Sequence, residues 1–185
     1  VTYDFRAHGY DPVTVNSSLA VIGVPVDLNV VKEYRDHKKD LKDVAPEWLV
    51  VDSPAGLHGD PLRDAVKKAD AMIVPVSPSA FDMAATARFL NQVAEFKAVR
   101  EGGLALALVA MRVDARTRSA AELDEFLKEL SFPLVTHLRD TQVYVYCARD
   151  GYSVFDLPRS RGEQDWEQWK PLTRWIARHA AERNA

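Results

Sequence analysis

The fold of this chain is most constrained by its apolar runs, in which polar residues do not alternate with apolar ones. These runs are Trp48–Val51, Ala71–Val76 and Leu104–Met111. A strand with one face in water alternates apolar and polar residues, whereas an unbroken apolar run indicates a strand buried on both faces, as in a parallel sheet. We therefore expect three adjacent strands in a mostly parallel sheet, at Leu49–Val51, Met72–Val76 and Leu104–Met111.

Apolar residues at helical spacing follow these runs, and Pro133–Leu138 adds a further predicted strand. The expected helical faces are Leu62, Ala65, Val66 and Ala69; Met83, Ala87, Leu90 and Ala94; Leu123, Phe126, Leu127 and Leu130; and Trp166, Trp169, Leu172, Ile176 and Ala180. The tryptophan-rich face of the last helix is typical of a surface that docks on a sheet. Alternating strands and helices predict an α/β fold, with a mostly parallel sheet and helices on both faces, in one domain spanning residues 1–185.

Capping patterns predict where several helices begin and end. Ser79 with Asp82, and Ser119 with Glu122, have the spacing of a capping box. Asp140 is expected to cap a helix that runs to about Arg149 and is closed by Gly151, because glycine accepts the left-handed conformation that often ends a helix. Arg112, Arg116 and Arg118 are expected in the loop after the Leu104–Met111 strand.

Composition excludes several classes of protein. The net charge of −3 means that nucleic-acid binding would need a local basic patch. The single cysteine, Cys147, leaves no disulfide framework and no cysteine pair for a metal. No apolar run is long enough to span a membrane and no signal peptide is visible, so we expect a cytoplasmic protein.

Asp52 is the first candidate site residue, because it follows the Trp48–Val51 run and precedes the turn Ser53–Gly56. Ligands of open α/β sheets lie beyond the carboxyl ends of the strands. A carboxylate at that position can hold Mg²⁺ beside a nucleotide phosphate. The alternative is an acid that ends a strand and caps the following turn.

Three blocks of sequence resemble the ParA/MinD family of deviant-Walker P-loop ATPases, and small ParA proteins in particular. They are VVDSPAGLHGD, KKADAMIVPVSPSAFDMAATARFL and LRDTQVYVYCARDGYSVFDLP, in this order. The resemblance implies an ATPase that segregates plasmids or positions cellular cargo. It would act through ATP-dependent homodimerisation and non-specific DNA binding, with ATP and Mg²⁺ as cofactors and an adaptor protein that stimulates hydrolysis.

The resemblance also implies roles for individual residues. Asp52 would be the catalytic Walker B acid and the metal ligand. Arg139 would lie in the region that contacts DNA without sequence preference. Binding of that kind needs only positive charge on the protein. Met111 stands where relatives often carry an asparagine that reads adenine, so base selectivity departs from the family pattern. The residues implied in nucleotide binding are Ser53, Pro54, Gly56, Ser77, Pro78, Met111 and Arg112.

The family's first strand and phosphate loop have no counterpart here, since no G-x-x-x-x-G-K-[ST] motif is present. Without that loop there is no amide cradle for the β-phosphate and no lysine to neutralise it. Either the chain is a piece of a longer ATPase, which we favour, or it is a relative that has lost hydrolysis. The 185 residues alone are therefore predicted not to turn over ATP.

A non-catalytic binding or scaffold protein that keeps the ParA-like surface is the competing function. A metabolic P-loop ligase on a similar fold is a third reading, but no substrate motif supports it. Coding sequence ahead of Val1 that carries a Gly-rich loop with a lysine would favour the ATPase over the scaffold.

Overall fold

The computed structural model describes Ser53 and residues 56–183. The predicted strand Leu49–Val51 lies outside these residues. Contacts divide the chain into the units Val1–Leu62 and Arg63–Ala185, and each is described by itself. The prediction of a single domain stays a prediction.

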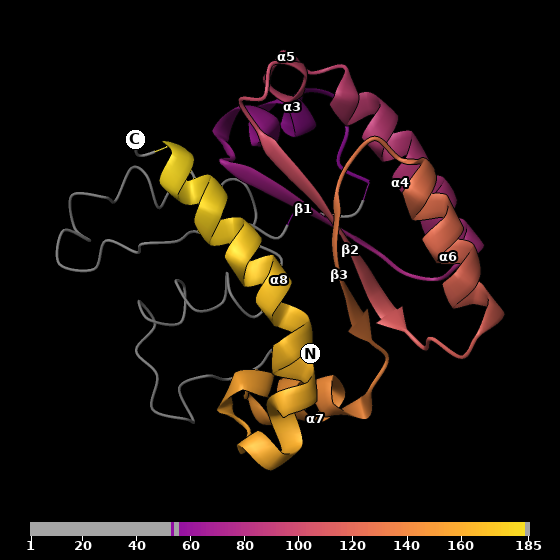
Figure 1. Cartoon of the computed structure of the whole chain (residues 1–185). Helices are drawn as coiled ribbons and strands as arrows, with labels where there is room; N and C mark the ends of the chain where they lie inside the picture. Colours follow the sequence, from indigo (N-terminus) through magenta and orange to yellow (C-terminus); the bar gives the residue numbers. More distant parts are fainter. Residues whose placement is uncertain (1–52, 54–55, 184–185) are drawn as a thin grey trace, which may run out of the picture. The chain divides into compact units, whose positions relative to one another are not determined.

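The sheet of the second unit has three strands in the order β1-β2-β3, all parallel (Figure 1). The strands are β1 (Ala71–Val76), β2 (Ala105–Val113) and β3 (Leu134–Arg139). The apolar runs at 71–76 and 104–111 are thus adjacent parallel strands, as predicted, with Met72 opposite Leu106 and Val76 opposite Ala110. The α/β fold predicted from these runs is confirmed.

Helices precede, connect and follow the strands. They are α3 (Gly59–Lys68), α4 (Ala80–Ala94), α5 (Lys97–Arg100), α6 (Arg118–Glu129), α7 (Gln142–Asp150), the 3₁₀ helix η3 (Val154–Asp156) and α8 (Arg159–Arg183). The crossover from β1 to β2 contains α4 and α5, and the crossover from β2 to β3 contains α6. This alternation explains why the strands can all run in one direction.

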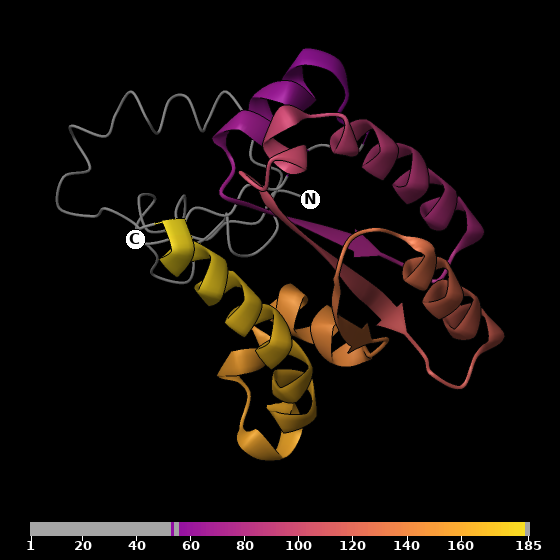
Figure 2. The same cartoon turned by 45° about the horizontal axis from the view of Figure 1, so that its top comes forward.

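Helices lie on both faces of the sheet, and Figures 1 and 2 agree on this arrangement. The α6 face is marked by His137 of β3, whose Nε2 lies 2.7 Å from Asp124 Oδ1 on α6. The opposite face packs on α8, where Val109 and Leu138 of the sheet form a buried cluster with Leu172. Trp169, Trp175 and Ile176 pack against that cluster, so the predicted docking face of the last helix is confirmed at Trp169, Leu172 and Ile176.

The first turns of α8 are fixed by a tight contact with η3. Trp166 Nε1 donates a hydrogen bond to the carbonyl oxygen of Val154 at 2.6 Å. A Cβ atom at Gly162 would lie 2.6 Å from the same nitrogen, so a larger residue would displace the indole ring. Glycine at 162 therefore serves close packing rather than backbone freedom.

Three of the predicted caps are wrong, and in two of them a neighbouring residue takes the position. Ser79 precedes α4 but makes no side-chain cap hydrogen bond, so the box with Asp82 does not form. Thr117, and not Ser119, caps α6 by accepting a hydrogen bond from Ala120 N at 3.2 Å. Thr141 caps α7 in place of Asp140, with Val143 N as its donor.

The predicted end of α7 is confirmed. Gly151 has φ 76° and occupies the C-cap, where its N–H bonds to the carbonyl oxygen of Cys147. Residues with a Cβ rarely adopt this left-handed conformation, which is why glycine could be identified as the stop from the sequence.

Candidate functional site

The carboxyl edge of the sheet gathers the loops that follow β1, β2 and β3, because all three strands are parallel (Figure 1). These loops contain Ser77 and Pro78, Asp114 to Thr117, and Asp140 with Thr141. Ligands of open α/β sheets bind at this edge. The structure therefore brings Ser77, Pro78, Met111 and Arg112, four of the predicted nucleotide-binding residues, to the loops or strand ends of one edge.

Ser77 and Pro78 are half-buried in the turn between β1 and α4. The turn is closed by a hydrogen bond from Ser79 N to the carbonyl oxygen of Ser77 at 2.8 Å. It is short because α4 begins at Ala80, directly after it. This geometry holds the two residues beside the carboxyl end of β1, and their nucleotide contact stays a prediction.

Arg112 has an unusual backbone, with φ 54°, and among the described residues other than glycine it alone has a positive φ. It lies inside β2, which extends two residues beyond the predicted strand end at Met111. The pairing with β3 shifts here, since Ala110 faces His137 whereas Val113 faces Arg139. The extra residue forms a bulge, and bulges of this kind re-aim a side chain at the rim of a sheet.

The bulge directs the two neighbouring side chains differently. Met111 is half-buried and packs against the cluster of Val109, Leu138 and Leu172. The Arg112 side chain is 74% exposed, and its Nε lies 3.6 Å from Asp140 Oδ1 in the loop after β3. A pair this exposed and this long contributes at most about 1 kcal/mol, so Arg112 can exchange Asp140 for an anionic ligand at little loss.

Asp114 and Arg116 form a tighter pair in the loop after β2. Arg116 Nε donates to Asp114 Oδ1 at 2.9 Å and Nη2 donates to Oδ2 at 2.7 Å. The side-chain hydrogen bond from Arg116, helped by its backbone N–H, lowers the pKa of Asp114 to about 2. The carboxylate stays ionised until the pH falls through about 2, so this Arg116 guanidinium remains occupied at neutral pH.

Arg139 is the predicted DNA-contacting residue, and its guanidinium is bound to α8. Its Nε and Nη2 donate to the two carboxylate oxygens of Asp165 at 2.8 and 2.9 Å. Asp165 is fully buried and the Arg139 side chain is 28% exposed. The hydrogen bond to Asp165 raises the pKa of Arg139. The pair fastens the end of β3 to α8, and contact with DNA stays a prediction.

Asp165 was not predicted as a site residue, although its helical spacing in the sequence could have indicated it. It lies seven residues before Leu172 and four before Trp169, which places it on the buried face of the last helix. An acid on such a face needs a charged partner.

Nearby, Trp169 Nε1 donates to the Tyr144 hydroxyl at 3.1 Å, and burial raises the pKa of Tyr144.

The remaining predicted residues belong to the first unit. Asp52 and Pro54 lie outside the described residues. Ser53 and Gly56 are exposed, and Gly56 has φ 75°. Their nucleotide contacts, and the Mg²⁺ site at Asp52, stay predictions.

Clusters of metal-ligating side chains and membrane-spanning helices are both absent from the described part of the chain. No group of three or more His, Cys, Asp or Glu residues there could hold a metal ion. None of the helices described there is both long and apolar enough to cross a membrane.

No protein family matches this chain, and no curated protein does.

Proposed function

We propose that this chain is a ParA-like ATPase that positions or segregates DNA or cellular cargo through ATP-dependent dimerisation. The observation that carries the proposal is the carboxyl edge of the parallel sheet, where an exposed arginine on a bulge lies beside the loop after β3. The resemblance of the sequence blocks quoted above supports the family part of the proposal. The carboxyl edge supports the nucleotide part, because ligands of open α/β sheets bind there.

Arg112 is the residue of this edge best suited to an anion. Its backbone is held in a strained conformation by the pairing of β2 with β3, and such strain is often kept where a side chain must be aimed at a ligand. Its partner Asp140 is also half exposed and lies 3.6 Å away. In the proposed function Arg112 leaves Asp140 and contacts ATP, while Asp52 holds Mg²⁺.

Phosphate release tests the ATPase proposal. We expect none above background from the 185 residues alone. A longer chain that carries a Gly-rich phosphate loop ahead of Val1 should hydrolyse ATP, and Asp52→Ala should abolish that activity. Arg112→Ala should weaken binding of a fluorescent ATP analogue by the longer chain, whereas Arg118→Ala on the outside of α6 should not.

Two results would contradict this account. Phosphate release from the 185 residues that is lost in Asp52→Ala would show that no phosphate loop is needed. A longer chain that contains the loop but neither binds nor hydrolyses ATP would favour the non-catalytic scaffold.

A test of DNA binding at Arg139 needs a variant that leaves no unpaired charge in the interior. Arg139→Ala alone would strand the Asp165 carboxylate in the interior, which destabilises proteins by about 3–5 kcal/mol. Arg139→Gln combined with Asp165→Asn removes both charges. If Arg139 contacts one phosphate, the double variant lowers the slope of log affinity against log salt by about 0.9 on duplex DNA. An unchanged slope would remove Arg139 from the DNA-binding surface.

A further inference from the structure

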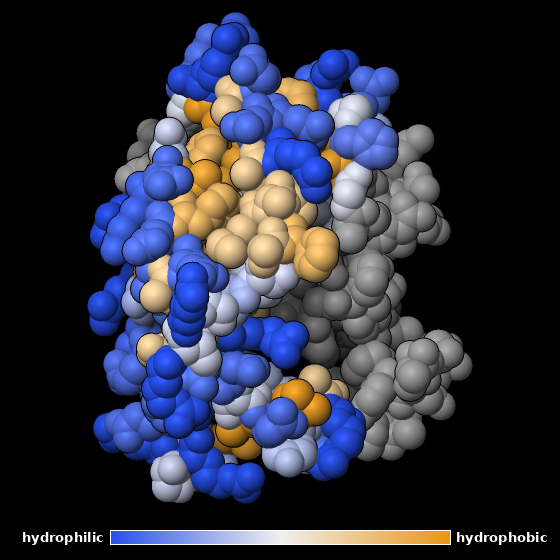
Figure 3. Space-filling view, turned by 90° about the vertical axis from the view of Figure 1, so that its right-hand side faces the viewer, coloured by the Kyte–Doolittle hydropathy of each residue, from blue (hydrophilic) through white to orange (hydrophobic). Residues whose placement is uncertain are grey.

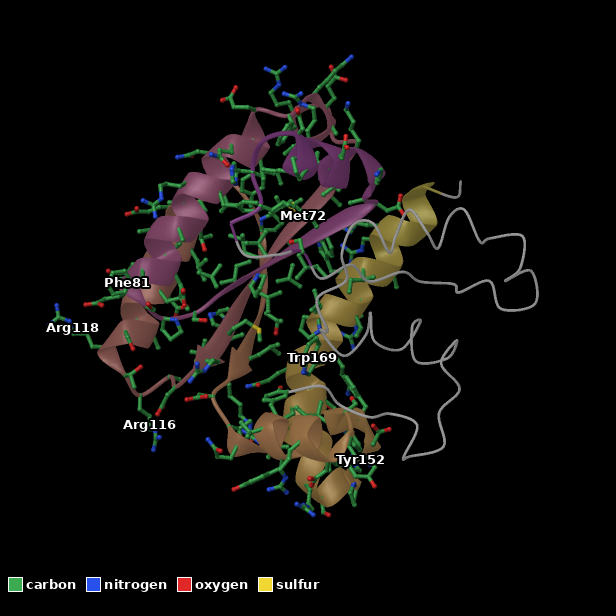
Figure 4. The ribbon with its side chains drawn as sticks, turned by 180° about the vertical axis from the view of Figure 1, so that it is seen from behind. Met72, Phe81, Arg116, Arg118, Tyr152 and Trp169 are labelled. Atoms are coloured by element: carbon green, nitrogen blue, oxygen red, sulfur yellow. The ribbon has the colours of Figure 1, made fainter. Side chains whose placement is uncertain are left out.

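The outer surface of α4 carries an apolar patch that the proposed function does not use. Phe81 is 88% exposed, the most exposed large hydrophobic residue in the described part of the chain. Ala80, Ala84 and Ala85 are exposed beside it. Figure 3 views the side on which α4 and α6 lie and shows an apolar area bordered by hydrophilic residues. Figure 4 places Phe81 on the outer side of α4.

The helical spacing makes the patch one continuous stripe. Ala84, Ala85 and Arg88 follow Phe81 at intervals of three, four and seven residues, so all four lie on one face of the helix. The inner face of the same helix is formed by Thr86, Leu90 and Val93, which are buried. An exposed ring beside small residues offers a projecting group and a shallow surface that another helix can approach closely.

Two charges flank the stripe without partners inside the described part of the chain. Neither Asp82 nor Arg88 forms a salt bridge there, whereas Arg118 on the outer face of α6 pairs with Glu122 at 2.9 Å. Asp82 lies three residues before Ala85 and Arg88 lies three residues after it. The two opposite charges are therefore placed symmetrically about Ala85.

Opposite charges at equal distances from one alanine make this face complementary in charge to an antiparallel copy of itself. We propose that the outer face of α4 binds the same face of a second copy of this chain, with the two helices antiparallel and crossing at Ala85. In a two-fold arrangement each contact occurs twice. Asp82 of each copy then faces Arg88 of the other. Phe81 packs over that same arginine, where a cation–π contact adds to the charge pair.

The proposal goes beyond the proposed function, because the contact needs no nucleotide. Ala84 and Ala85 permit the close approach of the two helices, and Phe81 supplies the apolar anchor that such interfaces require. A second copy of the same helix matches the spacing of Asp82 and Arg88 about Ala85. Self-association explains that spacing with the residues of this chain alone.

Sedimentation of the full 185-residue chain without nucleotide tests the proposal. We expect a concentration-dependent dimer. Phe81→Glu should raise its dissociation constant by about thirtyfold, as for an anchor residue. Tyr152→Glu changes an aromatic residue that is 62% exposed outside α4, and it should leave the constant unchanged. Far-ultraviolet circular dichroism checks that each variant is folded.

Variants of the proposed Asp82–Arg88 charge pair give a second test, in which Phe81 is unchanged. Asp82→Arg and Arg88→Asp should each weaken the dimer by about tenfold, and the two together should restore it to within about threefold. A wild-type chain that stays monomeric, or a dimer that is indifferent to Phe81→Glu, would overturn the proposal. A double variant as weak as the single ones would overturn the antiparallel arrangement. None of these results depends on ATP binding, so they are separate from a failure of the proposed function.

Discussion

Helices α4 and α6 are equivalent in position but different on their outer surfaces. Each lies in a crossover between neighbouring strands, and both bury an apolar inner face, with Leu90 and Val93 in α4 and Leu123 and Leu127 in α6. The outer face of α6 carries a charged pair, Arg118 with Glu122. These side chains keep the face hydrated and add a local contact. The corresponding face of α4 carries Phe81 and three exposed alanines, Ala80, Ala84 and Ala85.

This difference shows that burial against the sheet explains the choice of residues only on the inner face of each helix. A solvated outer face tolerates almost any polar residue, so an exposed ring at 81 needs a separate explanation. The proposed contact with a second copy supplies one. Each prediction below compares a change in α4 with the corresponding change in α6.

The largest effect is expected where the two helices are alike. Leu90→Ala in α4 and Leu123→Ala in α6 should each lower the free energy of unfolding by about 2–5 kcal/mol, because both side chains are buried and truncation leaves a cavity. Urea unfolding at low protein concentration measures both. If Leu90→Ala lost less than about 1 kcal/mol, α4 would not be held by the core in the way that α6 is.

A smaller effect on the free energy of unfolding is expected at the N-terminal caps, where α4 and α6 should differ. Thr117→Ala removes a side chain that caps α6 and should lower the free energy of unfolding by about 1 kcal/mol. Ser79→Ala should change it by less than about 0.5 kcal/mol, since Ser79 makes no cap hydrogen bond. Equal losses in the two variants would mean that Ser79 caps α4 in solution.

The smallest effect is expected at the surface arginines. Arg118→Ala breaks an exposed pair with Glu122 and should lower the free energy of unfolding of the monomer by at most about 0.5 kcal/mol. Arg88→Ala should leave the monomer unchanged and weaken the dimer. Thermal unfolding at low concentration and sedimentation at high concentration distinguish the two. A dimer weakened by Arg118→Ala instead would place the contact on α6.

The sequence predicts most of the architecture, because apolar periodicity is a local signal. The strands at 71–76 and 104–111, the docking face of α8 and the stop at Gly151 all follow from such patterns. The starts of α6 and α7 do not. In each, two residues that can cap stand within two positions, Thr117 and Ser119 or Asp140 and Thr141, and the cap pattern alone does not choose between them.

The candidate site is less predictable, because its geometry depends on residues far apart in the sequence. The positive φ of Arg112 arises from the register between β2 and β3. The pair of Arg139 with Asp165 joins residues separated by 26 positions. The exposure of Phe81 likewise depends on which face of α4 the sheet covers. Local sequence does indicate that Asp165 lies on the buried face of α8, but it does not identify Arg139 as the partner of that acid.

Disulfide cross-linking at the proposed crossing point tests the central contrast between α4 and α6 most directly. Ala85→Cys puts a thiol where two copies of α4 should meet, and Ala121→Cys puts one on the exposed face of α6 as the matched control. The native Cys147 is buried and present in both variants. A disulfide requires Cα atoms within about 7 Å. Under mild oxidation without nucleotide, we predict covalent dimers from Ala85→Cys and monomers from Ala121→Cys; equal cross-linking of both, or of neither, would contradict the account.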